Sequence, residues 1–128
     1  MGRHDLPGGF TDDQLRAFMK AILADVHALE RMLDEDRLET GIRRIGAEQE
    51  MFLLDKIGRA WCGADAMMKK LNHPQFTYEL AQFNLECNLK PQLFGGNCLS
   101  AMEKELQDLL QLARNAANEM GGGIVLTG

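Results

Sequence analysis

Residues 43–55 read RRIGAEQEMFLLD, and this stretch decides the fold. It has no apolar stripe at helical spacing, so residues 45–54 are predicted to form a strand that ends in a turn at 55–58. Side chains alternate between the two faces of a strand. One face receives Glu48, Glu50, Phe52 and Leu54, and the other receives Ala47, Gln49, Met51 and Leu53. The strand is therefore predicted to carry two carboxylates on one face.

A second segment, 77–89, alternates in the same way. Its apolar positions are Phe83, Leu85, Cys87 and Leu89, and its polar positions are Gln82, Asn84, Glu86 and Asn88. This pattern predicts a strand with one apolar face and one face of carboxylate and amides. The apolar run 124–126 predicts a third strand.

Three helices are predicted around these strands. After a leader at residues 1–10 that is rich in Gly and Pro, Thr11-x-x-Gln14 has the form of a capping box and begins a helix that runs toward Gly41. Its apolar stripe consists of Leu15, Phe18, Met19, Ile22, Val26, Leu29 and Leu33. A short helix is predicted at 64–71. A second capping box at Ser100-x-x-Glu103 predicts a helix over 99–120 that stops at Gly121.

The order of these elements predicts an α+β fold, in which an antiparallel sheet of three strands carries helices on one face. Two regions are expected: residues 1–41, a leader with an amphipathic helix, and residues 42–128, the sheet-containing part. Because the last strand lies so close to Gly128, the sheet is expected to be incomplete. An exposed sheet edge would then self-associate or be complemented by a missing C-terminal part.

Composition excludes several classes of partner. The chain has 128 residues, a net charge of −5 and no broad basic field, so neither nucleic acid nor an anionic membrane is an expected partner. No apolar run approaches the roughly 20 residues that span a bilayer. Three cysteines without CxxC spacing and three scattered histidines indicate packed thiols and no zinc site. A cytoplasmic protein is expected.

The carboxylates are the candidates for chemistry. Glu48 and Glu50 project from one face with Cα atoms roughly 6.5–7 Å apart, a spacing that suits a divalent cation such as Mg²⁺. The alternative is a polar face that is simply solvated. Glu79 and Glu86 are seven residues apart, which places them on opposite faces of an unbroken strand. A turn near 80–82 would bring both to one site, whereas Glu79 is otherwise an exposed residue at the strand start.

Three segments together resemble the glutamate-cysteine ligase family, in its bacterial carboxylate-amine ligase branch. They are RRIGAEQEMFLLD (43–55), YELAQFNLECNLKP (78–91) and GGIVLTG (122–128). The resemblance covers roughly residues 42–128 and corresponds to the N-terminal portion of such enzymes. It implies that Glu48, Glu50, Glu79 and Glu86 are metal ligands, and it makes Asn84 and Asn88 candidates for binding substrate or nucleotide.

The resemblance also implies part of a glutamine-synthetase-like catalytic fold, a curved antiparallel sheet that holds ATP, Mg²⁺ and small amino-acid substrates. The implied reaction activates a carboxylate as an acyl phosphate, which an amine then attacks to give an amide. Glutamate and cysteine are the family's best-known pair, a reaction of glutathione biosynthesis. The catalytic residues and the identity of both substrates stay open, and a chain of this length is expected to be inactive alone.

A different class of function is the alternative. In this interpretation the chain is a non-enzymatic interaction or regulatory module, whose amphipathic helices at 11–38 and 99–120 mediate assembly. The carboxylates would then belong to a solvated surface.

Overall fold

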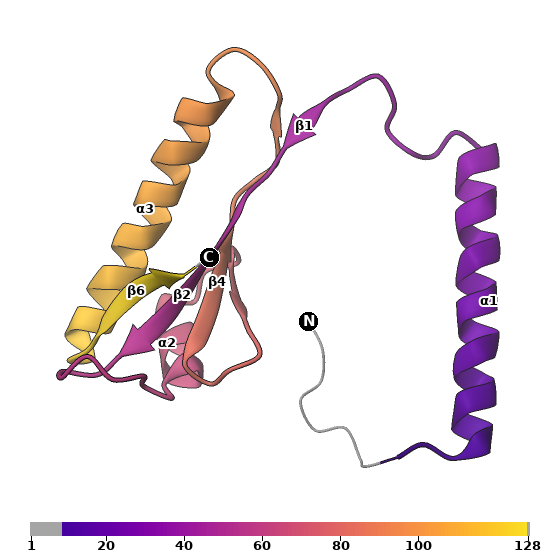
Figure 1. Cartoon of the computed structure of the whole chain (residues 1–128). Helices are drawn as coiled ribbons and strands as arrows, with labels where there is room; N and C mark the ends of the chain where they lie inside the picture. The colour runs from indigo at the N-terminus through magenta and orange to yellow at the C-terminus, as the bar shows by residue number, and fades with distance from the viewer. Residues whose placement is uncertain (1–8, 128) are drawn as a thin grey trace. The chain divides into compact units, whose positions relative to one another are not determined.

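The computed structural model describes residues 9–127, which divide into two compact units, 9–42 and 43–127 (Figure 1). Most of the predicted leader lies outside the described residues, as does Gly128.

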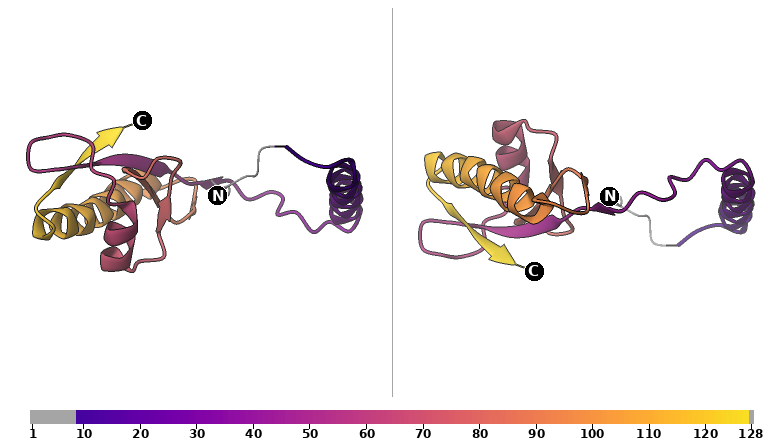
Figure 2. Two further views of the ribbon diagram at one scale, coloured as in Figure 1. Left: turned by 90° about the horizontal axis from the view of Figure 1, so that it is seen from below. Right: turned by 90° about the horizontal axis from the view of Figure 1, so that it is seen from above.

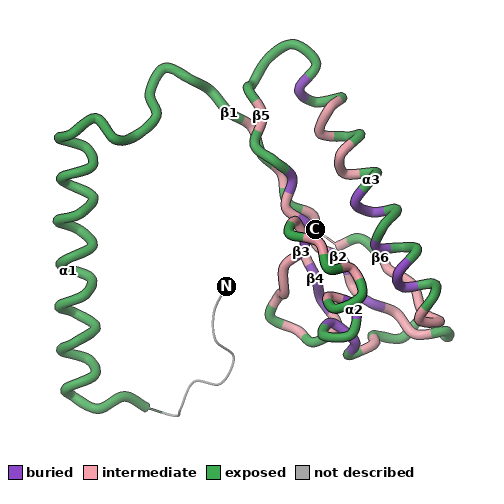
Figure 3. Tube along the Cα trace, turned by 180° about the vertical axis from the view of Figure 1, so that it is seen from behind, coloured by how far each residue is buried: buried purple, intermediate pink, exposed green. Residues whose placement is uncertain are grey.

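The first unit consists of helix α1 (Asp12–Asp34) and its flanking residues. The predicted capping box is confirmed, because the Gln14 N–H donates to Thr11 Oγ1 and the Thr11 N–H donates to Gln14 Oε1 at 2.9 Å. The helix ends at Asp34, earlier than predicted, and Asp36 follows with φ at 50°. No residue of α1 is buried (Figure 3).

The second unit is built on a four-stranded antiparallel sheet with the order β3-β4-β2-β6. Its strands are β2 (Glu48–Leu54), β3 (Phe76–Tyr78), β4 (Asn84–Asn88) and β6 (Gly123–Thr127). A separate two-stranded sheet pairs β1 (Arg44–Ile45) with β5 (Gln92–Leu93). The predicted α+β class with antiparallel pairing is therefore confirmed.

Two details of the predicted sheet are wrong. Residues 77–89 do not form one strand but a hairpin, since the Asn84 N–H donates to the Ala81 carbonyl at 3.0 Å and closes a turn between β3 and β4. The hairpin raises the strand number of the main sheet from three to four. The predicted strand 45–54 is also interrupted, so that Ile45 pairs with Gln92 in the small sheet while Glu48 begins β2.

Helices α2 (Ala64–Leu71) and α3 (Cys98–Glu119) lie on the same side of the main sheet (Figure 2). The predicted limits of α2 are confirmed. The capping box predicted at Ser100 is wrong, because α3 begins at Cys98 and its N-cap, Asn97, makes no side-chain capping bond. The predicted stop of α3 is confirmed: Gly121 has φ at 77°, and the Gly122 N–H donates to the Ala117 carbonyl.

The core lies between the sheet and these two helices. Met51 pairs with Leu85 across β2 and β4, and both side chains are fully buried. The helices cover this face with Met67 of α2 and Ala113 of α3, which are also fully buried. The alternation predicted for 47–54 is thus confirmed, and the opposite face of β2 and β4 carries the polar side chains. Within residues 9–127 no helix has the length and apolar character needed to cross a membrane.

Candidate metal site on the polar face of the sheet

The strand register places five of the six candidate residues on one face. Across β2 and β4, Glu48 is opposite Asn88, Glu50 is opposite Glu86, and Phe52 is opposite Asn84. Directly opposed residues of an antiparallel pair project to the same side of the sheet. Two segments that are more than 30 residues apart in sequence therefore combine into one row of carboxylates and amides.

Glu50 lies near the middle of this row and is held by Asn84. The Asn84 Nδ2 group donates to Glu50 Oε2 at 3.1 Å, and Asn84 is only 8% exposed. Next to them, the ring of Phe52 meets that of Phe83 edge-on, with centroids 5.3 Å apart. The Glu50 carboxylate is therefore bonded to a buried amide.

Glu86 is held by a second set of donors. Its Oε1 atom accepts hydrogen bonds from Asn88 Nδ2 at 2.7 Å and from Thr77 Oγ1 at 3.3 Å. Asn88 Nδ2 also lies 3.0 Å from Thr77 Oγ1, so the three groups form a closed network. Thr77 was missed by the sequence analysis, because its position opposite Glu86 depends on the hairpin.

Within residues 9–127, two buried oxygen atoms beside Glu50 have no hydrogen-bond partner: Asn84 Oδ1 and Thr127 Oγ1. Thr127 lies on β6 directly opposite Glu50, on the side of β2 away from β4. Buried polar atoms without partners are uncommon in folded proteins, and a bound ion or water is a frequent explanation. Thr127 was also missed by the sequence analysis, since only the β2–β6 register places it here.

At one end of the row the surface is hollowed. An open pocket of about 510 Å³ includes Glu48 and Asn88, which are opposed across the strands. The remaining lining residues are Gly46, Ala47, Leu89 and Pro91. Glu48 and Asn88, at one end of the row, therefore line an open pocket.

Glu79 is placed differently from the other candidates. It follows the last residue of β3 and is half-buried in the turn toward β4, outside the paired strands. Within residues 9–127, no three His, Cys, Asp or Glu side chains gather closely enough to hold a metal ion. The structure therefore brings Glu50 opposite Glu86, with Glu48 farther along the same face, and does not add Glu79 to them.

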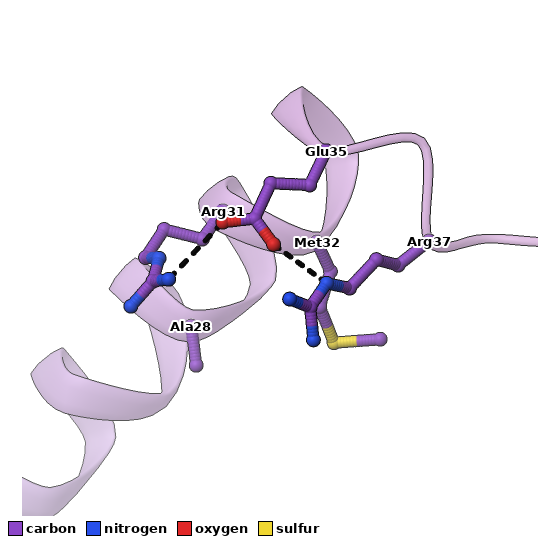
Figure 4. Close-up of a pocket in the computed structure, with 5 residues that line it drawn as sticks. All are labelled: Ala28, Arg31, Met32, Glu35 and Arg37. Atoms are coloured by element: carbon purple, nitrogen blue, oxygen red, sulfur yellow. Dashed lines mark hydrogen bonds and ion pairs between the residues drawn. The ribbon is translucent and has the colours of Figure 1, made fainter.

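A second pocket lies on the first unit, at the C-terminal end of α1 (Figure 4). Its volume is about 200 Å³, and Glu35 bridges two arginines there, Arg31 at 3.1 Å and Arg37 at 2.6 Å. The three side chains are at least 38% exposed, and exposed ion pairs of this kind contribute little. One carboxylate, that of the C-cap residue Glu35, therefore pairs with both guanidinium groups of this pocket.

On the apolar face of the sheet, the Cys87 thiol and the Tyr78 phenol both have raised pKa values. Burial raises the pKa of the Cys87 thiol, which keeps it protonated in the core. Burial and a hydrogen bond with Asp65 raise the pKa of Tyr78. Cys87 and Cys98 are buried, as the prediction of packed thiols requires, whereas Cys62 is exposed and the prediction is wrong for it.

Comparison of the chain with family models, with curated proteins and with solved structures finds no match.

Proposed function

We propose that residues 43–127 contribute the magnesium-holding part of an ATP-dependent carboxylate-amine ligase of the glutamate-cysteine ligase type. The observation that carries the proposal is the opposition of Glu50 and Glu86 beside two buried oxygen atoms, Asn84 Oδ1 and Thr127 Oγ1, that lack partners in the described part of the chain. Carboxylate, amide and hydroxyl oxygens are hard donors, the type that Mg²⁺ prefers.

The charges support a cation at this position. Like charges directly opposed across two strands destabilise a sheet, and a divalent ion between them reverses that effect. Mg²⁺ is commonly held by one or two carboxylates, and water and substrate phosphates fill its other positions. Glu50 and Glu86 are therefore sufficient protein ligands, even though a third carboxylate does not join them.

The surrounding residues have distinct proposed roles. Asn84 orients the Glu50 carboxylate, and Thr77 with Asn88 orients that of Glu86. Glu48 borders the open pocket, which is the proposed position of nucleotide or substrate. Glu79 is proposed as a further metal ligand of the complete enzyme, and the family resemblance is the only support for this role. The ion's contribution is to neutralise the phosphates and the charge that develops during phosphoryl transfer.

The sheet supports the same proposal at the level of architecture. A glutamine-synthetase-like fold uses one face of an antiparallel sheet for nucleotide, metal and substrate. Here α2 and α3 cover the apolar face that contains Met51 and Leu85, while the carboxylates line the other. The polar face is therefore not the one that α2 and α3 cover. A face that binds ligands must be left uncovered in this way.

Calorimetric titration with Mg²⁺ and a non-hydrolysable ATP analogue tests the proposal. Glu50→Gln and Glu86→Gln are each expected to weaken Mg²⁺-dependent binding at least tenfold, because each removes one of two opposed charges. The matched control is Glu103→Gln, an exposed carboxylate on α3, which should bind as the unmodified chain does. Equal affinity in all four proteins, or binding that does not depend on Mg²⁺, would contradict the proposal.

A further inference from the structure

Helix α1 exposes a complete apolar surface. Leu15, Phe18 and Leu33 are 47%, 61% and 56% exposed, and no residue of the helix is buried. Most helical stability in proteins comes from packing of an amphipathic face and not from helix propensity, and within its own unit this helix of 23 residues packs its apolar face on nothing. A helix of this composition therefore requires a partner surface.

The apolar residues follow a heptad repeat. If Leu15 is assigned to position d, every a and d position from 15 to 33 is apolar. The a positions are Met19, Val26 and Leu33, and the d positions are Leu15, Ile22 and Leu29. A repeat of 3.5 residues is the pattern of a helix that pairs with another helix, rather than of one that lies on a sheet.

We propose that two copies of this chain associate through α1 in an antiparallel coiled coil. With residue 24 at the centre, the seam aligns a positions with d positions throughout. Ile22 lies against Val26 of the other copy, Met19 against Leu29, and Leu15 against Leu33. All six seam residues of each copy are thereby covered.

Charge complementarity selects the antiparallel orientation. In that arrangement e positions meet e positions, so Arg16 lies near Glu30 of the other copy, and this attractive pair occurs twice. In a parallel dimer g positions meet the following e positions, so Asp25 would face Glu30 of the other copy. That like-charged pair would occur twice and would disfavour the parallel dimer.

The flanking apolar residues fit the same orientation. Leu23 at position e meets Leu23 of the other copy, and Phe18 at position g meets Met32. Leu23 and Phe18 are 56% and 61% exposed in the single chain, so both bury additional apolar area on pairing. The one opposing contact is Asp25 against Asp25 at the centre.

The charged residues are free to form these pairs. Arg16 lies 3.9 Å from Asp13, and Glu30 lies 3.0 Å from His27, in each case within the same helix. All four side chains are at least 63% exposed. Exposed ion pairs at this spacing contribute little to stability, so their replacement by pairs between two helices costs little.

The first test measures self-association of the full chain by sedimentation equilibrium. It compares a substitution at a seam position of α1 with one at an outer position. The unmodified chain is expected to be a dimer at tens of micromolar. Ile22→Asp places a charge in the seam and should weaken association at least tenfold, whereas Ala24→Asp, two residues away at an outer position, should not. A monomeric unmodified chain would overturn the proposal, as would a dimer that Ile22→Asp leaves intact, because another surface would then hold it.

Charge exchange tests the orientation and does not alter the apolar seam. Arg16→Glu and Glu30→Arg should each weaken the dimer severalfold, and the double variant should restore it. In a parallel dimer Glu30→Arg would instead strengthen association, because Asp25 would gain an opposite charge. Strengthening by Glu30→Arg, or failure of the double variant to restore the dimer, would overturn the antiparallel arrangement.

Discussion

Glu50 on β2 lies directly opposite Glu86 on β4, on the polar face of the sheet. Each carboxylate accepts hydrogen bonds from its own side-chain donors, Asn84 in one case and Thr77 with Asn88 in the other. Opposed like charges cost free energy unless another charge compensates them. The divalent cation proposed for this face would supply that compensating charge.

Asn84 should be important for stability as well as for the orientation of Glu50. Asn84→Ala removes the Nδ2 donor from a carboxylate in a half-buried environment, and we expect the free energy of unfolding to fall by about 1–3 kcal/mol. Asn118→Ala, at an exposed position of α3, is the matched control and should change stability by less than about 0.5 kcal/mol. Urea denaturation measures both. Equally small effects of the two substitutions would show that Asn84 does not support the site.

Replacement of the adjacent residues Gly122 and Gly123 by alanine should have different effects on the free energy of unfolding. A Cβ atom at Gly122 would lie 2.3 Å from the Leu54 carbonyl oxygen, whereas one at Gly123 meets nothing within 4 Å. Gly122→Ala should destabilise by about 1–3 kcal/mol, since backbone must move to make room. Gly123→Ala should be neutral or stabilise by up to about 1 kcal/mol through the unfolded chain. Thermal unfolding measures the stability of the two variants. Similar stability changes for both would contradict this close approach of Gly122 to Leu54 at the junction of α3 and β6.

The buried thiol of Cys87 should make the folded chain less stable at alkaline pH. Burial raises the pKa of its thiol above 9.0 in the folded chain, so in the alkaline range the unfolded chain loses this proton first. The unfolded state is then favoured, and stability falls as pH rises, by at most about 1 kcal/mol at pH 9.5. Urea denaturation at pH 7.5 and 9.5 should show a smaller decline for Cys87→Ala. The exposed Cys62 provides the control: Cys62→Ala should keep the full decline, and a full decline in both variants would contradict the assignment.

Alternation alone was enough to predict the polar face. In β2 the residues at every second position from Glu48 face one way, while Met51 and Leu53 are fully buried on the other side. The pattern of Asn84, Glu86 and Asn88 is equally regular. Burial of one face fixes the register of a strand, and the sequence analysis therefore identified most of the row.

The sequence analysis left a turn near 80–82 open as an alternative to one continuous strand, and the turn between β3 and β4 lies there. Residues 79–83 read ELAQF and contain neither Gly nor Pro, so nothing in them marks a break. The pairing of Thr77 with Glu86 decides the hairpin, and such pairing depends on contacts across strands. For the same reason Thr77 and Thr127 were missed, because each reaches the site only through its partner strand.

A double-mutant cycle on Glu50 and Glu86 tests the central claim most directly. Glu50→Gln, Glu86→Gln and the double variant isolate the interaction of the two carboxylates from the separate effects of their hydrogen bonds. Without a divalent cation, we predict an unfavourable coupling of roughly 0.2–1 kcal/mol in the free energy of unfolding. With Mg²⁺ and a non-hydrolysable ATP analogue at 100 times the dissociation constant, the unmodified chain gains about 2.7 kcal/mol and the coupling becomes favourable. A coupling with the same sign and size under both conditions would contradict a shared magnesium ion.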